Sequence, residues 1–492
     1  MPATQYLFFS SALMTVAVLL SACSSSDTSD PMDELIAAPT LVWSACEGSE
    51  TLECSRLKVP LDYSQPADNT LELALARLPA SSGQAAGAVV FNPGGPGSSG
   101  VALVSALERM NLPELLTERF DIVGFDPRGV GGSRPVNCAE FGEDDLDLYP
   151  TTPAAVRNLE QQLNDYIAAC QQKYGDYLLH LGSNNVARDM DKIRLALGQD
   201  KLRFVGYSYG TRLASLYAQL FPAEVGALVL DGAMPPEGGM FKLSRDAMLQ
   251  MHANLLALLQ SCTLDAAPCD DAQLLTQIEQ RITFLLTEDH LEELDLFGDL
   301  LMISVQDPEI GEIVLPALRA YVELADLNVL EQFLAQFESI TGEALVESDD
   351  SVVEEDSFAL QTAVLCADDP VRPTVDEIIG LLEPFNASSD LFAEVYVSEA
   401  GRCMGWPASI DPLQPVTTEV DAPVLVIGGT SDAETPLIWS REMAMGMESA
   451  LIVSDHAGHT VTFKQTSDCV DQRVIEVLVD GQVSGDAECN AN

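Results

Sequence analysis

Two kinds of hydrophobic pattern alternate along the chain between residue 41 and about residue 235. Short, nearly continuous apolar runs are typical of strands that helices cover on both faces of a sheet. These runs lie at 71–78, 88–91, 121–125, 202–206 and 227–230. Amphipathic helical patterns lie between some of them, as at 154–173 and 186–197. The alternation predicts an α/β fold with a mostly parallel sheet.

The pattern changes between about residue 236 and residue 415. Strand-like runs vanish from this stretch, and amphipathic helical stripes replace them. One such stripe consists of Leu274, Ile278, Ile282 and Leu285. The α/β pattern then returns, with apolar runs at 423–428 and 450–453. We therefore expect an α/β core made of 41–235 and 416–492, with a helical cap at 236–415 inserted between its two parts.

The first forty residues have the pattern of an export signal followed by a tether. Residues 7–20 are apolar over a length typical of a signal peptide and too short for a membrane span. They lead into Leu-Ser-Ala-Cys23, followed by Ser and Asp residues, which resembles a bacterial lipobox. We expect a lipoprotein signal peptide at 1–22, lipidation of Cys23 and a flexible tether at 23–40.

This interpretation predicts an exported protein that is lipid-anchored in the bacterial cell envelope, most simply at the outer membrane. Its contact with the membrane would be made only through the lipid on Cys23. An ordinary cleaved signal peptide and a misassigned start codon are the alternatives, because residues 1–9 lack the basic residues that usually open a signal peptide.

The cysteine count agrees with export. Eleven cysteines are present, and lipidation of Cys23 leaves ten, enough for five disulfides in an oxidising compartment. Pairing neighbours along the chain gives Cys46–Cys54, Cys138–Cys170, Cys262–Cys269, Cys366–Cys403 and Cys469–Cys489. Free buried thiols are the alternative. With no C-x2-C pair and only five histidines, the sequence indicates no zinc site, and nothing in it implies another metal or an organic cofactor.

The charge balance excludes some classes of partner. The chain has 24 Lys and Arg against 76 Asp and Glu, a formal net charge of −52. It should repel nucleic acid and anionic bilayers, because binding phosphate groups requires basic patches. Its hydrophobic share of 47% is that of a globular protein, which excludes disorder of the chain as a whole.

The strongest chemical motif lies at 206–210, Gly-Tyr-Ser-Tyr-Gly. An apolar strand leads into it and a helix-forming run follows it. Strand, tight turn and helix in this order are typical of a nucleophile elbow, in which glycines allow strand and helix to approach closely. Ser208 is therefore the predicted nucleophile, and a glycine-rich packing turn is the alternative.

A serine nucleophile needs a general base, and this kind of fold supplies the acid and then the base after the serine. His459 follows the last predicted strand in a loop where an imidazole can reach the serine, so we predict that it is the base. His456 in the same loop is the alternative. The remaining histidines either precede the serine or lie in the predicted cap, and they are His180, His252 and His290.

The acid should follow the strand at 423–428, since these sheets place their sites at the carboxyl ends of strands. Asp432 occupies this position and would orient His459 and stabilise its imidazolium. Glu434 is the neighbour most easily confused with it. Asp231, at the end of the run 227–230, is a second alternative.

Backbone N–H groups are needed where the oxyanion forms. The glycine-rich stretch 92–100 follows a strand and would expose such groups. We predict that the N–H of Tyr209, the residue after the nucleophile, acts with the N–H of Gly94 or Gly95. A plain loop is the alternative.

Taken together, the segments 92–100, 121–129, 206–211 and 428–432 resemble the α/β-hydrolase peptidases of the proline iminopeptidase and tripeptidyl aminopeptidase group. The last part of the chain, with His459-Thr, Cys469-Val and Cys489, resembles the tripeptidyl-aminopeptidase-like C-terminal segment of that family. The resemblance implies an α/β-hydrolase sheet with an inserted helical cap, and a serine exopeptidase that cuts peptides near a free N-terminus.

Three further residues enter only through this resemblance. Asp126 and Arg128 match a family motif, for which an internal ion pair that holds a loop is the simpler interpretation. Asp368 lies in Leu-Cys-Ala-Asp-Asp, a segment like one in the family, and would bind the substrate ammonium.

The function that we predict is hydrolysis of peptides near a free N-terminus by a Ser-His-Asp acyl-enzyme mechanism, as in aminopeptidases or tripeptidyl aminopeptidases. A carboxylesterase or other ester hydrolase with the same triad is the first alternative. A non-catalytic surface lipoprotein that binds a ligand is the second. The negative charge should favour cationic or neutral peptides over acidic ones.

Overall fold

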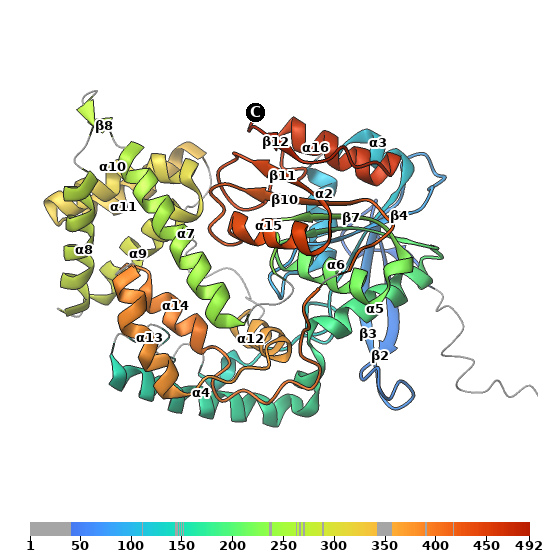
Figure 1. Ribbon diagram of the computed structural model, residues 1–492, viewed down its shortest axis with the longest axis horizontal. Coiled ribbons are helices and arrows are strands. Elements are labelled where there is room, and N and C mark those ends of the chain that lie inside the picture. Colours follow the sequence, from blue (N-terminus) through green and yellow to red (C-terminus); the bar gives the residue numbers. More distant parts are fainter. Residues whose placement is uncertain are drawn as a thin grey trace, which may run out of the picture. The chain divides into compact units, whose positions relative to one another are not determined.

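The part of the chain that the computed structural model describes contains one large sheet of ten strands (Figure 1). Its strand order is β1-β2-β3-β5-β4-β6-β7-β10-β11-β12. The antiparallel neighbours are β1–β2, β2–β3 and β3–β5, whereas every pair from β5 through β4 to β12 is parallel. The strands are β1 (Ser44–Ala45), β2 (Glu53–Pro60), β3 (Thr70–Leu78), β4 (Ala88–Asn92), β5 (Asp121–Phe125), β6 (Leu202–Tyr207), β7 (Val225–Asp231), β10 (Val424–Gly429), β11 (Ala450–Ser454) and β12 (Ala487–Cys489).

The structure describes 41–110, 112–142, 146, 148, 150, 152–235, 239–261, 263–264, 267–268, 271–287, 290–341, 357–388, 391–416 and 418–492. The predicted signal peptide, Cys23 and the tether lie outside these residues. The predicted disulfide Cys262–Cys269 lies outside them as well.

Successive residues of the inner strands point to opposite faces of the sheet, and each face has its own core. Along β4, Val89 and Phe91 belong to one hydrophobic cluster and Val90 to the other. The first face is covered by α2 (Gly100–Arg109), α3 (Glu114–Arg119) and α16 (Asp468–Ile475). The second is covered by α5 (Ser183–Ala196), α6 (Tyr209–Leu220) and α15 (Leu437–Gly446). Burial on both faces explains why these strands are continuous apolar runs.

A helical insertion separates β7 from β10, its neighbour in the sheet (Figure 1). Its helices are α7 (Met240–Ser261), α8 (Asp271–Thr287), α9 (Leu291–Gln306), α10 (Pro308–Leu324), α11 (Asn328–Thr341), α12 (Ser357–Asp368), α13 (Val375–Ser388) and α14 (Ala393–Gly401). The short strands β8 (Thr263–Leu264) and β9 (Ala267–Pro268) pair within it. The long α4 (Pro153–Tyr174) packs against α13 of the insertion. Whether 236–415 is a separate cap domain remains a prediction.

Four disulfides are present among the described cysteines, and each joins two cysteines that are neighbours along the chain, as predicted. They are Cys46–Cys54, Cys138–Cys170, Cys366–Cys403 and Cys469–Cys489. None of the helices in the described ranges is long and apolar enough to span a membrane.

Candidate functional site

Ser208 stands in a strained turn between β6 and α6. Its backbone angles are φ 53° and ψ −124°, a positive φ that a non-glycine residue rarely adopts. A Cβ on Gly206 would lie 2.4 Å from the carbonyl oxygen of Gly210, and a Cβ on Gly210 would lie 2.9 Å from the carbonyl oxygen of Asn92, so neither glycine can be enlarged without a backbone shift. The Ser208 N–H donates to the carbonyl of Asp231 at 2.9 Å, which fastens the turn to β7. This is the local geometry that the Gly-x-Ser-x-Gly pattern predicts.

The glycine-rich loop after β4 packs directly against this turn. A Cβ on Gly94 would lie 2.9 Å from the Ser208 Cβ and 3.0 Å from the Tyr209 nitrogen. The Gly94 N–H already donates to the Asn92 side-chain oxygen at 3.1 Å. The Gly95 N–H makes no hydrogen bond with any described residue. Of the two predicted loop donors, Gly95 is therefore the one whose N–H is free to meet an oxyanion.

His459 and Asp432 lie in contact at the carboxyl ends of β11 and β10. The His459 Nδ1 is 2.9 Å from the Asp432 Oδ2 and 3.1 Å from its Oδ1. Asp432 is 1% exposed, and its Oδ1 also accepts the backbone N–H groups of Glu434 and Thr435. The Thr435 hydroxyl donates to the Asp432 Oδ2 at 2.7 Å and lies 3.2 Å from the His459 Nδ1. Sequence reasoning missed Thr435, although a threonine three residues after an aspartate can form such a local turn.

The imidazole lies beside the strained turn. A Cβ on Gly232 would be 3.1 Å from the His459 Cε1. Gly232 directly follows Asp231, whose carbonyl accepts the Ser208 N–H. No hydrogen bond joins the Ser208 Oγ to the His459 Nε2 within the described ranges. Such bonds are often long in a free enzyme and tighten when substrate binds. The geometry therefore brings the three predicted residues to one edge of the sheet.

The carboxylates around His459 decide its protonation. Burial of the ring disfavours the imidazolium, but the negative charge and hydrogen bond of Asp432, with a smaller contribution from Glu434, outweigh this. The pKa of His459 is therefore raised above its ordinary value. Glu434 does not replace Asp432, since its Oε2 lies 3.7 Å from Nε2, the ring nitrogen on the opposite side.

The alternative acid, Asp231, contacts the backbone of the histidine loop instead of the ring. Its Oδ2 accepts the N–H groups of Val461 at 2.8 Å and Thr462 at 2.6 Å. The loop holds Thr460 at φ 59° and Phe463 at φ 62°, so these bonds hold a strained backbone in place. Within the described residues, His456 makes no hydrogen bond with Asp432; its backbone N–H donates to the Ser454 hydroxyl.

The helical insertion contacts the candidate site at two points. The Asn254 amide of α7 donates to the carbonyl of Ser431 at 2.7 Å, directly before the candidate acid. Leu360 of α12 packs over the glycine-rich loop, since its Cδ2 would be 3.4 Å from a Cβ on Gly97. The insertion therefore contacts both the loop that carries the candidate acid and the loop that carries the predicted oxyanion donor.

Asp368, predicted to bind an ammonium group, is 3% exposed and has internal partners. It accepts the N–H of Ser183 at 2.7 Å and its hydroxyl at 2.5 Å, and it lies 3.5 Å from the Arg212 guanidinium. The Ser183 hydroxyl is also 2.6 Å from that of Tyr209. A hollow of about 230 Å³ lies beside Asp368. Binding of an ammonium group by Asp368 remains a prediction that would have to compete with these contacts.

The two other motif residues hold loops, but they do not pair with each other. Arg128 is fully buried and binds both carboxylate oxygens of Asp189 at 2.8 Å. Asp126 accepts the Ser99 hydroxyl at 2.6 Å and the Gly132 N–H at 2.9 Å. Both residues therefore support the loop that follows β5.

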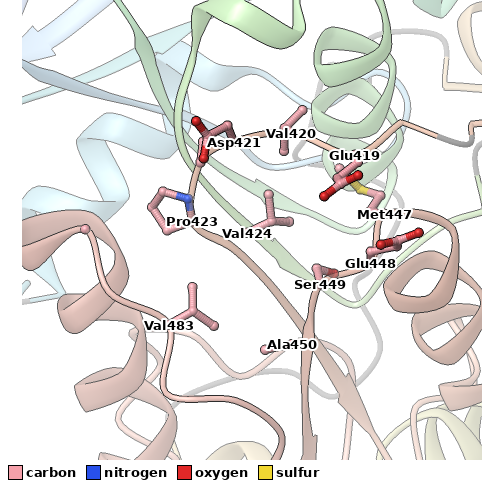
Figure 2. Close-up of a pocket in the computed structure, with 12 residues that line it drawn as sticks. Glu419, Val420, Asp421, Pro423, Val424, Met447, Glu448, Ser449, Ala450 and Val483 are labelled. Carbon is pink, nitrogen blue, oxygen red and sulfur yellow. The ribbon is translucent and has the colours of Figure 1, made fainter.

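A larger hollow, of about 520 Å³, lies at the other edge of the sheet (Figure 2). The segments that precede β10 and β11 line it, and they carry Glu419, Asp421 and Glu448. Because β6, β7, β10 and β11 are parallel, the amino ends of β10 and β11 lie opposite the carboxyl end of β6, where Ser208 stands. This hollow therefore takes no part in the candidate site.

Comparison with known proteins places these features in a family. Residues 87–465 match the family model described as the alpha/beta hydrolase fold. The chain is 31% identical to the serine protease Hip1 of Mycobacterium tuberculosis over 464 residues, 87% of this chain and 85% of that protein. It is 31% identical to carboxylesterase B of the same organism over 484 residues, 91% of this chain and 89% of that protein. It is also 35% identical to the tripeptidyl aminopeptidase of Streptomyces lividans over 205 residues, 39% of this chain and 38% of that protein.

Proposed function

Because this chain belongs to the α/β-hydrolase fold family, we propose that it is a serine exopeptidase that hydrolyses peptides near a free N-terminus. The observation that carries the proposal is the bond between His459 and Asp432 beside the strained turn of Ser208. The likeness to a serine protease and to a tripeptidyl aminopeptidase supports peptides as the substrate class.

In the proposed mechanism, His459 takes the proton of Ser208 as the hydroxyl oxygen attacks the scissile carbonyl. Asp432 holds the imidazole in the tautomer with a proton on Nδ1 and stabilises the imidazolium that forms. The N–H groups of Tyr209 and Gly95 bind the oxyanion of the tetrahedral adduct. His459 then gives its proton to the leaving amine. Water next attacks the acyl-enzyme while His459 takes a proton from it, and His459 returns that proton to the Ser208 oxygen as the acyl group leaves.

Ser208→Ala should remove essentially all turnover while the fold and the disulfides stay intact. Labelling by a fluorophosphonate probe should disappear in the same variant, because the probe needs the activated hydroxyl. Retention of more than a few per cent of the activity would overturn the role of Ser208. A wild-type protein that the probe does not label would favour the non-catalytic alternative.

A carboxylesterase is the second candidate, and the likeness to carboxylesterase B over 91% of the chain supports it. Peptide substrates with free and with blocked N-termini, assayed beside simple acyl esters, separate the two functions. Exopeptidase action predicts that blocking the N-terminus abolishes cleavage. Preference for esters with no effect of the free amine would establish the esterase instead.

We further propose that the protein is exported and anchored by a lipid on Cys23, as the sequence at 20–23 suggests. Cys23→Ser should then release the protein from the membrane fraction of the expressing cell and abolish its labelling with a fatty acid. If the variant fractionates like the wild-type protein, the lipid anchor is wrong and an ordinary cleaved signal peptide is the better interpretation.

A further inference from the structure

Glu434 occupies an unusual position, because its carboxylate faces the working nitrogen of the candidate base. Its Oε2 lies 3.7 Å from the His459 Nε2, while Asp432 binds Nδ1 on the other side of the ring. The Glu434 side chain is 49% exposed. Among the described residues, no Lys or Arg side chain pairs with it, and its ionic contact is with His459. An acidic group near this nitrogen is not required for holding the imidazole, since Asp432 already does so.

We propose that Glu434 stabilises the positive charge that develops on an amine leaving group, and so favours peptides over esters. This rests on the proposed function. The leaving nitrogen must come within about 3.2 Å of Nε2 to receive its proton. Since Nε2 lies 3.7 Å from Glu434, the leaving nitrogen cannot be farther than about 7 Å from the carboxylate.

The chemistry distinguishes the two kinds of leaving group. In the tetrahedral adduct of a peptide, the nitrogen takes the His459 proton and becomes positively charged. The C–N bond then breaks, its electron pair stays on nitrogen, and a neutral amine leaves that takes a further proton from water. In an ester, the same proton neutralises the negative charge that develops on the alkoxide oxygen, so little positive charge forms on the leaving group, whereas the preceding imidazolium is common to both substrates. A carboxylate at this place therefore stabilises the first transition state more than the second.

The expected size of this effect follows from the distance and the exposure of Glu434. At about 7 Å, in the high effective dielectric of a half-exposed group, one charge changes a rate by about three- to tenfold. Added salt should shrink the effect, because the Debye length falls to about 3 Å at 1 M.

The test uses two substrates with the same unblocked acyl peptide, joined either to alanine amide or to lactic acid amide. They differ only in the scissile N–H or oxygen, and they release the same acyl product. Glu434→Gln should lower kcat/KM for both substrates, because the imidazolium of His459 forms with either, and should lower it about three- to tenfold more for the peptide than for the ester. Glu434→Asp should restore part of the preference for the peptide. The control is Glu419→Gln, an exposed carboxylate of the hollow in Figure 2, which should change neither rate constant.

Glu434 also contributes to the raised pKa of His459, and this second effect must be separated from the first. The charged groups that face the histidine ring are Asp432 and Glu434. Those that contact the rest of its loop are Asp231 and Asp471, which accept backbone N–H groups, Lys464, whose Nζ donates to the His459 carbonyl, and Asp307, whose Oδ2 would be 3.7 Å from a Cβ on Gly458. A change in the pKa of His459 shifts the acidic limb of the pH profile of kcat/KM equally for both substrates. The rate constants are therefore compared on the plateau above that limb.

The outcomes separate the inference from the function on which it rests. If Glu434→Gln lowers both rate constants by the same factor, or neither, the role in leaving-group choice is wrong while the exopeptidase function stands. If the wild-type protein hydrolyses the ester and not the peptide, both are wrong. The ester rate in each variant also reports whether the protein is folded.

Discussion

Replacing Asp432 with asparagine should remove most of the activity and leave the fold intact, because the structure decides where the new amide group must point. Oδ1 accepts two backbone N–H groups, those of Glu434 at 3.0 Å and Thr435 at 2.8 Å. Backbone donors cannot become acceptors, so the amide oxygen of the variant has to take the Oδ1 position. The NH2 group then replaces Oδ2, which lies 2.9 Å from the His459 Nδ1.

The consequence is a histidine in the wrong tautomer. The new NH2 group donates to Nδ1 of His459 and forces the single ring proton onto Nε2. Nε2 must be unprotonated to accept the Ser208 proton, so the general base is lost. The packing is preserved, because the asparagine side chain has nearly the same volume as that of aspartate. A loss of this kind lowers kcat by about 10³- to 10⁴-fold, which corresponds to about 4–5.5 kcal/mol in the barrier.

The assay compares kcat on an unblocked peptide, the rate of fluorophosphonate labelling and the melting temperature. The Ser208→Ala variant gives the background rates of turnover and labelling. Asp486→Asn is the matched control, because that exposed carboxylate also accepts a backbone N–H, from Leu451 at 2.9 Å, but at the amino end of β11. Retention of more than about one tenth of the activity in Asp432→Asn would refute the reasoning, as would a loss that merely follows unfolding.

Three further predictions concern the pH dependence, the oxyanion loop and the support of the site. Since carboxylates raise the pKa of His459 and only the neutral ring acts as a base, activity should rise with pH through a midpoint above about 6.5; a midpoint at or below that pH in the kcat/KM profile would contradict this. Gly94→Ala should lower kcat more than about a hundredfold, since its Cβ would lie 2.5 Å from a backbone oxygen. Gly83→Ala has the same sign of φ with nothing within 4 Å and is its control; equal activity of the two variants would refute the close packing. Arg128→Met should lower the free energy of unfolding by about 3–5 kcal/mol, because it leaves the buried carboxylate of Asp189 unpaired; a loss below about 1 kcal/mol in chemical denaturation would contradict this.

The inner strands were predictable because burial on both faces makes them continuous apolar runs. The predicted run at 121–125 coincides with β5, and the runs at 88–91 and 202–206 each end one residue short of the observed strand. The outer strands were missed. β2 does carry a strand signal, since Leu57 and Val59 are buried and alternate with exposed Arg56 and Lys58. β1 and β12 have two and three residues, too few to show any period.

The candidate site divides in the same way. The nucleophile turn is a local property of 206–210, because glycines on both sides of one serine allow a conformation that other residues would block. The order of serine, acid and histidine along the chain then pointed to Asp432 and His459. Local sequence could not reveal that Asp231 supports the histidine loop, since that contact joins residues 230 positions apart.

The sequence alone determined the net charge, which excludes nucleic acid and anionic bilayers as partners, and the number of cysteines, which limits how many disulfides can form. What each carboxylate does was decided only by the tertiary structure. The sequence favoured Asp432 as the acid and left Glu434 and Asp231 as alternatives; in the structure Asp432 binds Nδ1, Glu434 faces Nε2 and Asp231 holds backbone N–H groups. The physical reason is that hydrogen bonds and charge interactions act over a few ångströms in space, and only the folded sheet brings the ends of β7, β10 and β11 within that reach.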